Sequence, residues 1–455
     1  MTSDKHAIVI GASVSGLMAA AVLHDRAYRV TVLDRDRLPL ANESRKAIPQ
    51  GHHAHGLLCG GIMALEDILP GATNELLACG AVDADIASDV RFFNEGQPLA
   101  RFPSDLRSLL MSRPLFEGYL RTRVRQLPNV TILDGLDVVE LIAKQGVICG
   151  VRAKARGSAE LTHGMSADLV VDASGRGSRL NGWLQRLGFE PAPEERVHTD
   201  IRYASCTYRR RSDDAGGARG LIAAVAPPDK RSGVVLAQED DRWMVTLVGC
   251  LGDVPEPTHH GMREFARGLS NSAIYELMRG AEPLSEPVGM RFPFSQRCRY
   301  ELLTRFPEGV LAIGDTLCSF NPSFGQGMSV AALQAVALRD CLREQDGSPW
   351  KQLFRETAKI IDTPWTIAVG ADLAYPEVEG KRSIVGNLLG RYVRALRRGA
   401  VHDPHLGYAF LRVAQLLDDP SALLKPSLAL RTLRASRAAS PLPAAQITQR
   451  ESFAG

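Results

Sequence analysis

The stretch AIVIGASVSG, residues 7–16, decides the fold, because it joins a buried strand to a helix through a glycine-containing turn. Residues 7–10 form a short, wholly apolar run, as a strand buried on both faces requires. Residues 17–23 predict a helix of small residues that packs closely on a sheet, and residues 29–33 predict a second strand. A strand, a helix and a strand in this order form the unit that builds a parallel sheet.

The turn in this stretch matches the dinucleotide-binding fingerprint, except that Ser13 stands where the middle glycine is usual. A small residue is needed there because the backbone approaches a diphosphate, whose charge is held at the helix N-terminus. Asp34 ends the second predicted strand, where a carboxylate can accept hydrogen bonds from an adenosine ribose. An ordinary tight turn is the alternative, but the pattern favours a nucleotide site made by Gly11, Ser13, Val14, Ser15, Gly16, Asp34 and Arg35.

A second glycine-rich segment follows a predicted buried strand at residues 309–313. Asp315 can accept a hydrogen bond from a ribityl hydroxyl. The N-terminus of the next predicted helix, residues 328–342, can stabilise negative charge on a reduced flavin. A helix-capping turn is the structural alternative. Together the two segments predict FAD, with further contacts from Gly314, Asp315, Pro322, Gly325, Gln326, Gly327 and Met328.

With these motifs the chain resembles the p-hydroxybenzoate-hydroxylase-like (group A) FAD-dependent monooxygenases. Within them it is most similar to the flavin-dependent epoxidases of polyether-ionophore biosynthesis. The resemblance rests on residues 11–16 with Asp34, and on residues 45–55, 112–115, 172–178 and 314–329.

The resemblance implies roles for three further residues. Arg45 would lie near a mobile isoalloxazine, Arg113 would open a helix beside the flavin, and Asp172 would belong to the cofactor site. It also implies that NADPH or NADH, as a transient reductant, reduces the flavin. O2 would then form a C4a-hydroperoxide, which transfers electrophilic oxygen to an apolar unsaturated small molecule. The function expected on these grounds is alkene epoxidation in secondary metabolism.

The predicted fold is α/β, with a Rossmann-like FAD-binding domain of the glutathione-reductase type and an inserted, mostly antiparallel sheet for the substrate. Residues 233–238 and 242–248 carry this second sheet as a hairpin. The FAD-binding domain is predicted in three parts, at residues 1–85, 105–190 and 291–345. The substrate sheet takes residues 86–104 and 191–290, and a helical region at 346–435 and a flexible tail at 436–455 follow.

The inserted sheet is expected to form an apolar substrate chamber with contacts from Tyr203, Leu236, Trp243 and Phe324, although core packing is the alternative for each. Because this lining offers few bases, no side chain is assigned as acid, base or nucleophile, and the flavin carries the chemistry. A phenol gains from deprotonation whereas an alkene does not, so epoxidation is favoured over aromatic hydroxylation.

The sequence bears on three other functions. A flavin-dependent prenyl reductase stays open, and so does a non-catalytic FAD-fold binding protein. A flavin halogenase is disfavoured because the Trp-x-Trp-x-Ile-Pro signature is absent.

Composition excludes several classes of protein. The 54 Lys and Arg nearly balance the 51 Asp and Glu, so nothing points to nucleic acid. The apolar run at residues 17–23 is too short to span a bilayer, which predicts no stable membrane insertion. The eight scattered Cys without a C-x-x-C pair indicate a reduced, cytoplasmic protein. A separate flavin reductase and the oligomeric state stay open.

Two clusters of cationic or titratable side chains have no assigned role. His52, His53 and His55 lack an acidic or Cys partner at metal-binding spacing, so no metal site is predicted. Arg394, Arg397 and Arg398 fall on one side of a predicted helix, for which a solvated basic face is the usual explanation.

Overall fold

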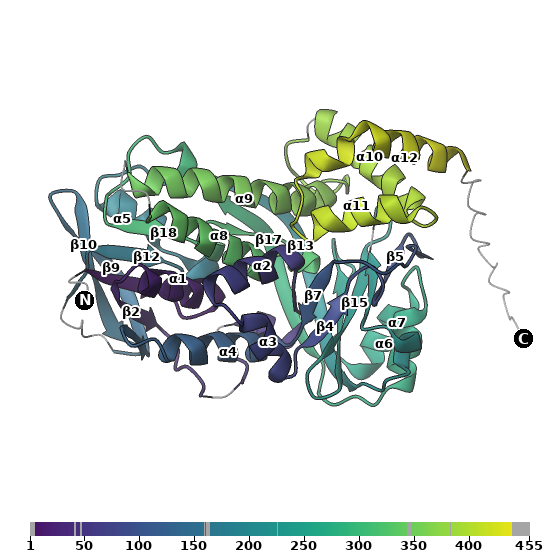
Figure 1. Cartoon of the computed structure of the whole chain (residues 1–455), viewed down its shortest axis with the longest axis horizontal. Helices are drawn as coiled ribbons and strands as arrows, with labels where there is room; N and C mark the ends of the chain where they lie inside the picture. Colours follow the sequence, from purple (N-terminus) through teal and green to yellow (C-terminus); the bar gives the residue numbers. More distant parts are fainter. Residues whose placement is uncertain are drawn as a thin grey trace, which may run out of the picture.

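The computed structural model of the chain describes residues 5–40, 42–45, 48–158, 160, 164–224, 226–343, 348–382 and 384–438. The tail predicted at residues 436–455 lies outside the described residues from residue 439 onward. The chain forms two large sheets with helices around them (Figure 1), which confirms the predicted α/β class.

The first large sheet is wholly parallel, with the order β18-β12-β1-β2-β8. Its central strands are the two predicted from the first motif, and their apolar residues are buried on both faces. The bounds are β1 His6–Ile10, β2 Arg29–Asp34, β8 Val130–Asp134, β12 Leu169–Asp172 and β18 Val310–Ala312. This is the Rossmann-like sheet that the sequence predicts.

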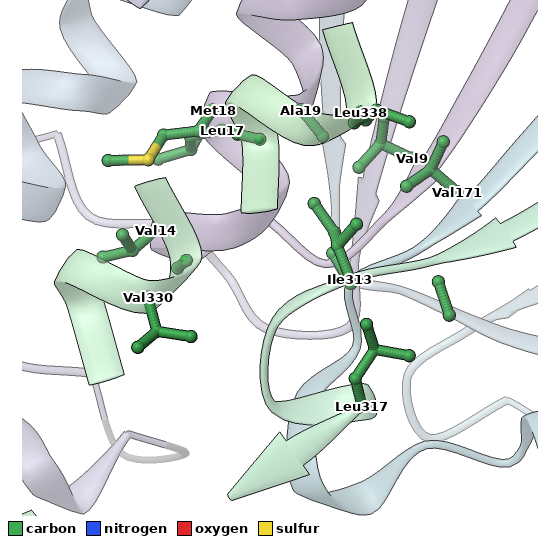
Figure 2. Close-up of a cluster of buried hydrophobic side chains, with 14 of the residues drawn as sticks. Val9, Val14, Leu17, Met18, Ala19, Val171, Ile313, Leu317, Val330 and Leu338 are labelled. Carbon is green, nitrogen blue, oxygen red and sulfur yellow. The ribbon is translucent and has the colours of Figure 1, made fainter. Parts of the chain in front are cut away.

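Two helices pack on one face of this sheet, α1 (Val14–Asp25) and α8 (Gly327–Cys341). Figure 2 shows Leu17 and Ala19 of α1 lying with Leu338 of α8 against the strand residues Val9 and Val171. Small side chains on α1 let the helix lie close to the strands, as the sequence predicts. This close packing places the N-termini of both helices at the carboxyl ends of the strands, where ligands of such sheets bind.

Smaller elements complete this half of the molecule. A three-stranded antiparallel sheet, β11-β10-β9, contributes Val151 and Ala153 to the same core. A second three-stranded sheet has the order β3-β7-β4. The bounds are β3 Gly56–Leu57, α2 Cys59–Ile68, α3 Ala72–Ala78, β4 Val82–Asp85, β7 Arg107–Leu110, α4 Arg113–Arg125, β9 Leu136–Lys144, β10 Val147–Ala155, β11 Met165–Ser166 and α5 Leu180–Arg186.

The second large sheet has eight strands in the order β19-β17-β13-β16-β15-β14-β5-β6, and all neighbours are antiparallel except β14 and β5. The predicted hairpin is β15 with β16. One predicted boundary differs, because β17 continues past residue 290 to Cys298. The bounds are β5 Val90–Asn94, β6 Gln97–Pro98, β13 Glu194–Arg209, β14 Gly220–Ala224, β15 Arg231–Gln238, β16 Arg242–Gly249, β17 Val288–Cys298 and β19 Cys318–Ser319.

Helices cover this second sheet and close the molecule. The short helices α6 (His259–Arg267) and α7 (Ala273–Gly280) pack on one of its faces. Helix α9 (Pro349–Asp372) lies along α8, and a cluster of three helices lies near β5 (Figure 1). The three are α10 Ile384–Gly399, α11 Pro404–Ala414 and α12 Pro426–Ala438. In the described parts of the chain, no helix combines the length and apolarity needed to cross a membrane.

Candidate functional site

A cavity of about 2140 Å³ runs between the two large sheets and on to α10. It connects the two glycine-rich segments, which lie some 300 residues apart in the sequence. Most of the residues predicted to contact the cofactor line it: Gly11, Ser13, Val14, Ser15, Asp34, Arg35, Arg45, Arg113, Asp315, Pro322, Gly325, Gln326, Gly327 and Met328. Gly16, Asp172 and Gly314 do not.

Two of the glycines outside the lining shape the site through their lack of a side chain. A Cβ on Gly16 would lie 1.8 Å from the carbonyl oxygen of Gly11, so only glycine lets the turn close. Gly314 has φ +71°, and a Cβ there would lie 2.2 Å from the Oγ of Ser15. These contacts bring the start of α1 and the turn after β18 together at one end of the cavity.

The two helices that follow the glycine-rich segments, α1 and α8, have open N-termini. The residues before them, Ser13 for α1 and Gln326 for α8, form no side-chain capping bond. The Oε1 atom of Gln326 is buried and has no partner in the described structure. The first N–H groups of each helix are therefore free to bind a negatively charged or carbonyl oxygen from the cavity.

The hydroxyl of Ser13 explains why serine replaces the middle glycine of the fingerprint. It donates to Oε1 of Glu117 at 2.6 Å and accepts from Nη2 of Arg113 at 3.1 Å. Arg113 also donates through Nε to Glu117 at 2.8 Å, one helical turn along α4. Ser13 thus holds the first turn of α1 against α4 and fixes Arg113 at the cavity. Glu117, the buried residue that organises this contact, was not predicted from the sequence.

Asp34 lies where the sequence places it, at the end of β2, and bonds to Arg45. Oδ2 of Asp34 accepts from the backbone N–H of Ala12 at 2.7 Å, which still leaves this oxygen one acceptor position. Arg45 donates to Oδ1 of Asp34 at 2.7 Å and lies near Asp36 and Glu117. Arg45 therefore lies beside Asp34 at the end of β2, and its predicted contact with an isoalloxazine stays a prediction.

The prediction for Asp172 is corrected. Its carboxylate is wholly buried and accepts three hydrogen bonds, from the backbone N–H and Oγ of Ser174 and from Oγ of Ser178. Asp172 therefore stabilises the turn after β12 and presents no oxygen to the cavity. The structure brings that turn to the cavity through Ser174, Gly175 and Arg176 instead.

Asp315 lines the cavity from the turn after β18. Burial raises the pKa of its carboxyl, and the positive charges of Arg113 and Arg176 oppose that rise. Arg176 is fixed over the rings of Phe292 and Phe294, at 4.5 and 4.3 Å from their centroids. Two arginines therefore flank the carboxylate that the sequence assigns to a ribityl chain.

Of the predicted substrate contacts, Tyr203, Leu236 and Phe324 line the cavity and Trp243 does not. Trp243 pairs across the hairpin with Ala237 rather than with Leu236, so it points to the opposite face of the sheet. There it is fully buried in the core under α6 and α7, and its Nε1 donates to Asp214 at 3.0 Å. The prediction for Trp243 was wrong because Leu236 and Trp243 occupy opposite faces.

A buried carboxyl that the sequence analysis missed, Asp372, lies at the end of α9 and lines the cavity. Its Oδ1 accepts from Nδ2 of Asn321 at 3.0 Å, and the hydroxyl of Tyr203 donates to Oδ1 of Asn321 at 3.2 Å. Its Oδ2 is buried without a partner in the described structure. Burial raises the pKa of Asp372 to about 6, whereas the hydrogen bond from Asn321 lowers it. The sequence contains one signal for this buried carboxyl: Asp372 lies at helical spacing on the same face of α9 as the apolar residues from Trp365 onward.

His53 is a second polar group of the chamber. Its Nδ1 lies 2.7 Å from Oγ of Ser205, and its Nε2 is buried without a partner in the described structure. Burial and the nearby His52 lower the pKa of His53 to about 4. Burial and Arg113 lower the pKa of His55 to about 3, so both imidazoles are neutral at pH 7. Within the described residues, no three His, Cys, Asp or Glu side chains lie together as metal ligands.

Solved structures of monooxygenases share this fold. The p-nitrophenol 4-monooxygenase PnpA of Pseudomonas putida superposes with a TM-score of 0.66 and 16% identity, over 92% of this chain and 99% of PnpA. The structure of pqsL, described as a probable FAD-dependent monooxygenase from Pseudomonas aeruginosa, superposes with a TM-score of 0.60 and 17% identity. That superposition covers 89% of this chain and 99% of pqsL.

Sequence comparison identifies a relative close enough to show the family of the chain. It is 34% identical over 441 residues to Protein Rv3254 of Mycobacterium tuberculosis, which covers 93% of this chain and 91% of that protein. The chain therefore belongs to the same family as Rv3254. It is also 28% identical over 353 residues to squalene monooxygenase SE1 of Panax ginseng, but spans only 58% of that protein's length. No protein-family model matches the chain.

Proposed function

We propose that the protein is an FAD-dependent monooxygenase that oxygenates an apolar, unsaturated small molecule. The observation that carries the proposal is the single cavity that joins both glycine-rich segments to the chamber beside Tyr203. A nucleotide cofactor bound along the two segments would reach this chamber without leaving the cavity. The class of sequence relatives and the fold support the same function.

The residues at the cavity fit FAD. The open N-terminus of α1 would hold the diphosphate, and the remaining acceptor position of Asp34 would take a ribose hydroxyl. Asp315 would accept from the ribityl chain, and Arg113 would lie beside it. The open N-terminus of α8, with the unpartnered Gln326, would stabilise negative charge on the ring system. FAD, when bound and reduced by NADPH or NADH, supplies the activation of O2.

The chain's own part in the reaction is to orient the substrate and to exclude water. Leu236 and Phe324 offer apolar surface, and the Tyr203 hydroxyl is held by Asn321 and by Ser323 at 3.2 Å each. A chamber with such walls favours a substrate without charge at the site of oxygenation. Alkene epoxidation is our first candidate for the reaction, and the similarity to squalene monooxygenases over 74% of this chain supports it.

Hydroxylation of a phenol is the second candidate, and a specific observation favours it. The sequence analysis expected few proton-relay groups in the chamber, whereas the structure contains His53 and the Tyr203–Asn321–Asp372 chain. With a pKa of about 6, Asp372 could take up a proton from a substrate hydroxyl near neutral pH. The chamber therefore contains more groups that can accept a proton than the sequence indicated, which weakens the argument for epoxidation over aromatic hydroxylation.

The cofactor half of the proposal is tested by the flavin content of the purified protein. The wild-type protein should show flavin absorbance near 450 nm, roughly as any oxidised flavoprotein does. Asp315→Ala should weaken FAD retention by about 1–3 kcal/mol, because a hydrogen-bond partner in the site is lost. Asp67→Ala, which removes an exposed partner of Arg339, should not change FAD retention. A wild-type protein that binds only a nicotinamide nucleotide would contradict the proposal.

The reaction half is tested with ¹⁸O2, FAD and NADPH, with a flavin reductase added where it is needed. A linear polyene and a panel of phenols are offered separately. Label in an epoxide, or in the diol from its opening, supports the first candidate. Label in a hydroxylated ring with the polyene untouched supports the second and overturns the first. Asp372→Asn separates them further, since it should slow only phenol hydroxylation, by at least about tenfold.

A further inference from the structure

One face of α10 lines the far end of the cavity, and this face is basic. Gly386, Gly390, Arg394 and Arg397 follow one another at helical spacing and all line the cavity. A Cβ on Gly390 would meet no atom within 4 Å, so the space beside this stripe is open. The sequence interpretation of a solvated basic face is therefore incomplete, since these arginines face a cavity.

The arginines at this end outnumber the carboxylates that could neutralise them. Arg398 pairs with Glu95 at 2.8 Å, and Glu95 is the carboxylate that acts on Arg397. Arg397 lies over the ring of Phe410, and its Nε is buried without a partner in the described structure. Burial lowers the pKa of Arg397 to about 10. For Arg394, the described residues supply neither a carboxylate nor a hydrogen-bond acceptor. Arg394 and Arg397 thus have between them only Glu95, which already pairs with Arg398, so an anion would be bound favourably here.

A floor of mostly apolar side chains connects this end to Tyr203. Phe92 pairs with Ile222, Ile222 with Val234, and Val234 with Thr246 in the register of the second sheet, and all four line the cavity. The next strand is β13, which carries Tyr203. Four strand spacings of about 4.8 Å give this floor a length of roughly 19 Å.

We propose that the arginine face of α10 is an anion-binding site for the headgroup of a long-chain amphiphile. Arg394 and Arg397 bind its carboxylate or phosphate, and its apolar chain lies on the floor of the second sheet, with its far end at Tyr203. The inference rests on the proposed function, which it deepens by naming the chemical class of the substrate. Arginine suits this role because its planar guanidinium forms paired hydrogen bonds with both anions.

The site can be tested by adding one charge to the open space next to it. Gly390→Asp places a carboxylate one helical turn from Arg394, and Gly390→Asn places a side chain of nearly the same shape without the charge. Binding is measured by displacement of a fluorescent fatty acid from the purified full-length protein. The competitors are a sixteen-carbon monounsaturated acid and its methyl ester. We expect wild type and Gly390→Asn to prefer the acid at least tenfold, and Gly390→Asp to lose this preference.

A second pair of variants removes the positive charges instead. Combined Arg394→Gln and Arg397→Gln should abolish the preference for the acid and leave the affinity for the ester within about twofold of wild type. The control is Arg434→Gln on α12, which lies outside the cavity and should behave as wild type. The coenzyme A thioester of the same acid distinguishes the two sources of negative charge. If it binds more tightly than the free acid, and through the same arginines, the anion is a phosphate.

Equal affinity of wild type for acid and ester would overturn the proposal, and so would a preference that survives in Gly390→Asp and in the double arginine variant. Flavin absorbance is recorded on the same samples. A protein that prefers the acid but holds no FAD would refute the proposed function and leave the anion site intact. A protein that holds FAD but does not distinguish the acid from the ester would refute the anion-binding site and leave the proposed function intact.

Discussion

A single buried carboxyl, Asp372, changes what the chamber can do chemically. It shares Asn321 with Tyr203 and leaves one oxygen unpartnered in the described structure, although it belongs to a helix whose buried side is otherwise mainly apolar. Burial raises its pKa to about 6, so the folded chain holds its proton between about pH 4 and 6, where an unfolded chain would have lost it. Above pH 6 the buried carboxylate is ionised in the folded protein, and this lowers the free energy of unfolding.

Asp372→Asn should therefore stabilise the protein at neutral pH. In wild type the free energy of unfolding contributed by this group falls as the pH rises from about 4 to about 6 and stays low above. The variant has no such dependence, so its advantage over wild type should grow from near zero at pH 4 to about 1–3 kcal/mol at pH 7. Urea unfolding of both proteins across this range measures the difference. A difference that is the same at every pH would show that Asp372 does not titrate as described.

Replacing Glu117 tests how much a buried ion-pair network contributes to the free energy of unfolding. Glu117 lies 2.8 Å from Arg113 and 3.7 Å from Arg45, and all three side chains are largely buried. Glu117→Gln removes the ion-pair partner of the largely buried Arg113, while Arg45 keeps Asp34 and Asp36, so we expect a loss of about 3 kcal/mol in the free energy of unfolding. Glu75→Gln breaks a half-exposed pair with Arg123 and should cost less than about 1 kcal/mol. Similar costs for both variants would mean that burial does not set the strength of the Glu117 contacts.

Among the elements, the sequence predicted those whose residues carry a strict local pattern. Apolar runs in the sequence predicted β1, β2 and β12. The turn before α1 was predicted from its glycines, because its tight conformation leaves no room for a side chain. The face of Trp243 could not be predicted, because either face of a strand can be buried when helices cover one side and a chamber covers the other. The place of Arg45 could not be predicted either, since it depends partly on Glu117, which is distant in sequence and belongs to helix α4.

The turn before α1 allows a comparison of one substitution in two helices. Gly16→Ala puts a methyl group 1.8 Å from the carbonyl oxygen of Gly11, so it should cost more than about 2 kcal/mol and reduce FAD binding. Gly370→Ala in α9 meets no atom within 4 Å and should gain up to about 1 kcal/mol through better helix propensity. Thermal and urea unfolding of the two variants measure both signs. Stabilisation by Gly16→Ala would show that helix propensity, and not the close approach, dominates at residue 16.

At the scale of the whole molecule, the two faces of the second large sheet have different tasks. One face packs in the hydrophobic core under α6 and α7, and the other lines the cavity. Trp243 on β16 lies in the core under α6 and α7, whereas Tyr203 on the neighbouring strand β13 lines the cavity. The alternation of side chains along β13 and β16 separates these two tasks by one residue. A substitution on one face should therefore leave the property carried by the other face unchanged.

Variants of these two aromatic residues should give opposite results. Trp243→Phe loses volume and the hydrogen bond to Asp214, so it should lower the free energy of unfolding by about 1–3 kcal/mol with turnover per bound FAD unchanged. Tyr203→Phe removes a hydroxyl from Asn321 and should change stability by less than about 1 kcal/mol. It should lower the hydroxylation of a phenol at least about tenfold. Loss of turnover in Trp243→Phe at full FAD content would contradict this separation.

The parallel pairing of β5 with β14 also has a consequence during synthesis of the chain. β5 ends at Asn94, and the strand it pairs with begins at Gly220, so the ribosome adds roughly 130 residues between them. At about 5–20 residues per second, β5 waits for roughly 6 to 25 s with its edge unpaired. One edge of β1 pairs early with β2, but its other edge waits still longer, because β12 begins only at Leu169. Nascent chains of this protein therefore expose strand edges for many seconds, which is the condition under which chaperones that bind extended segments are recruited.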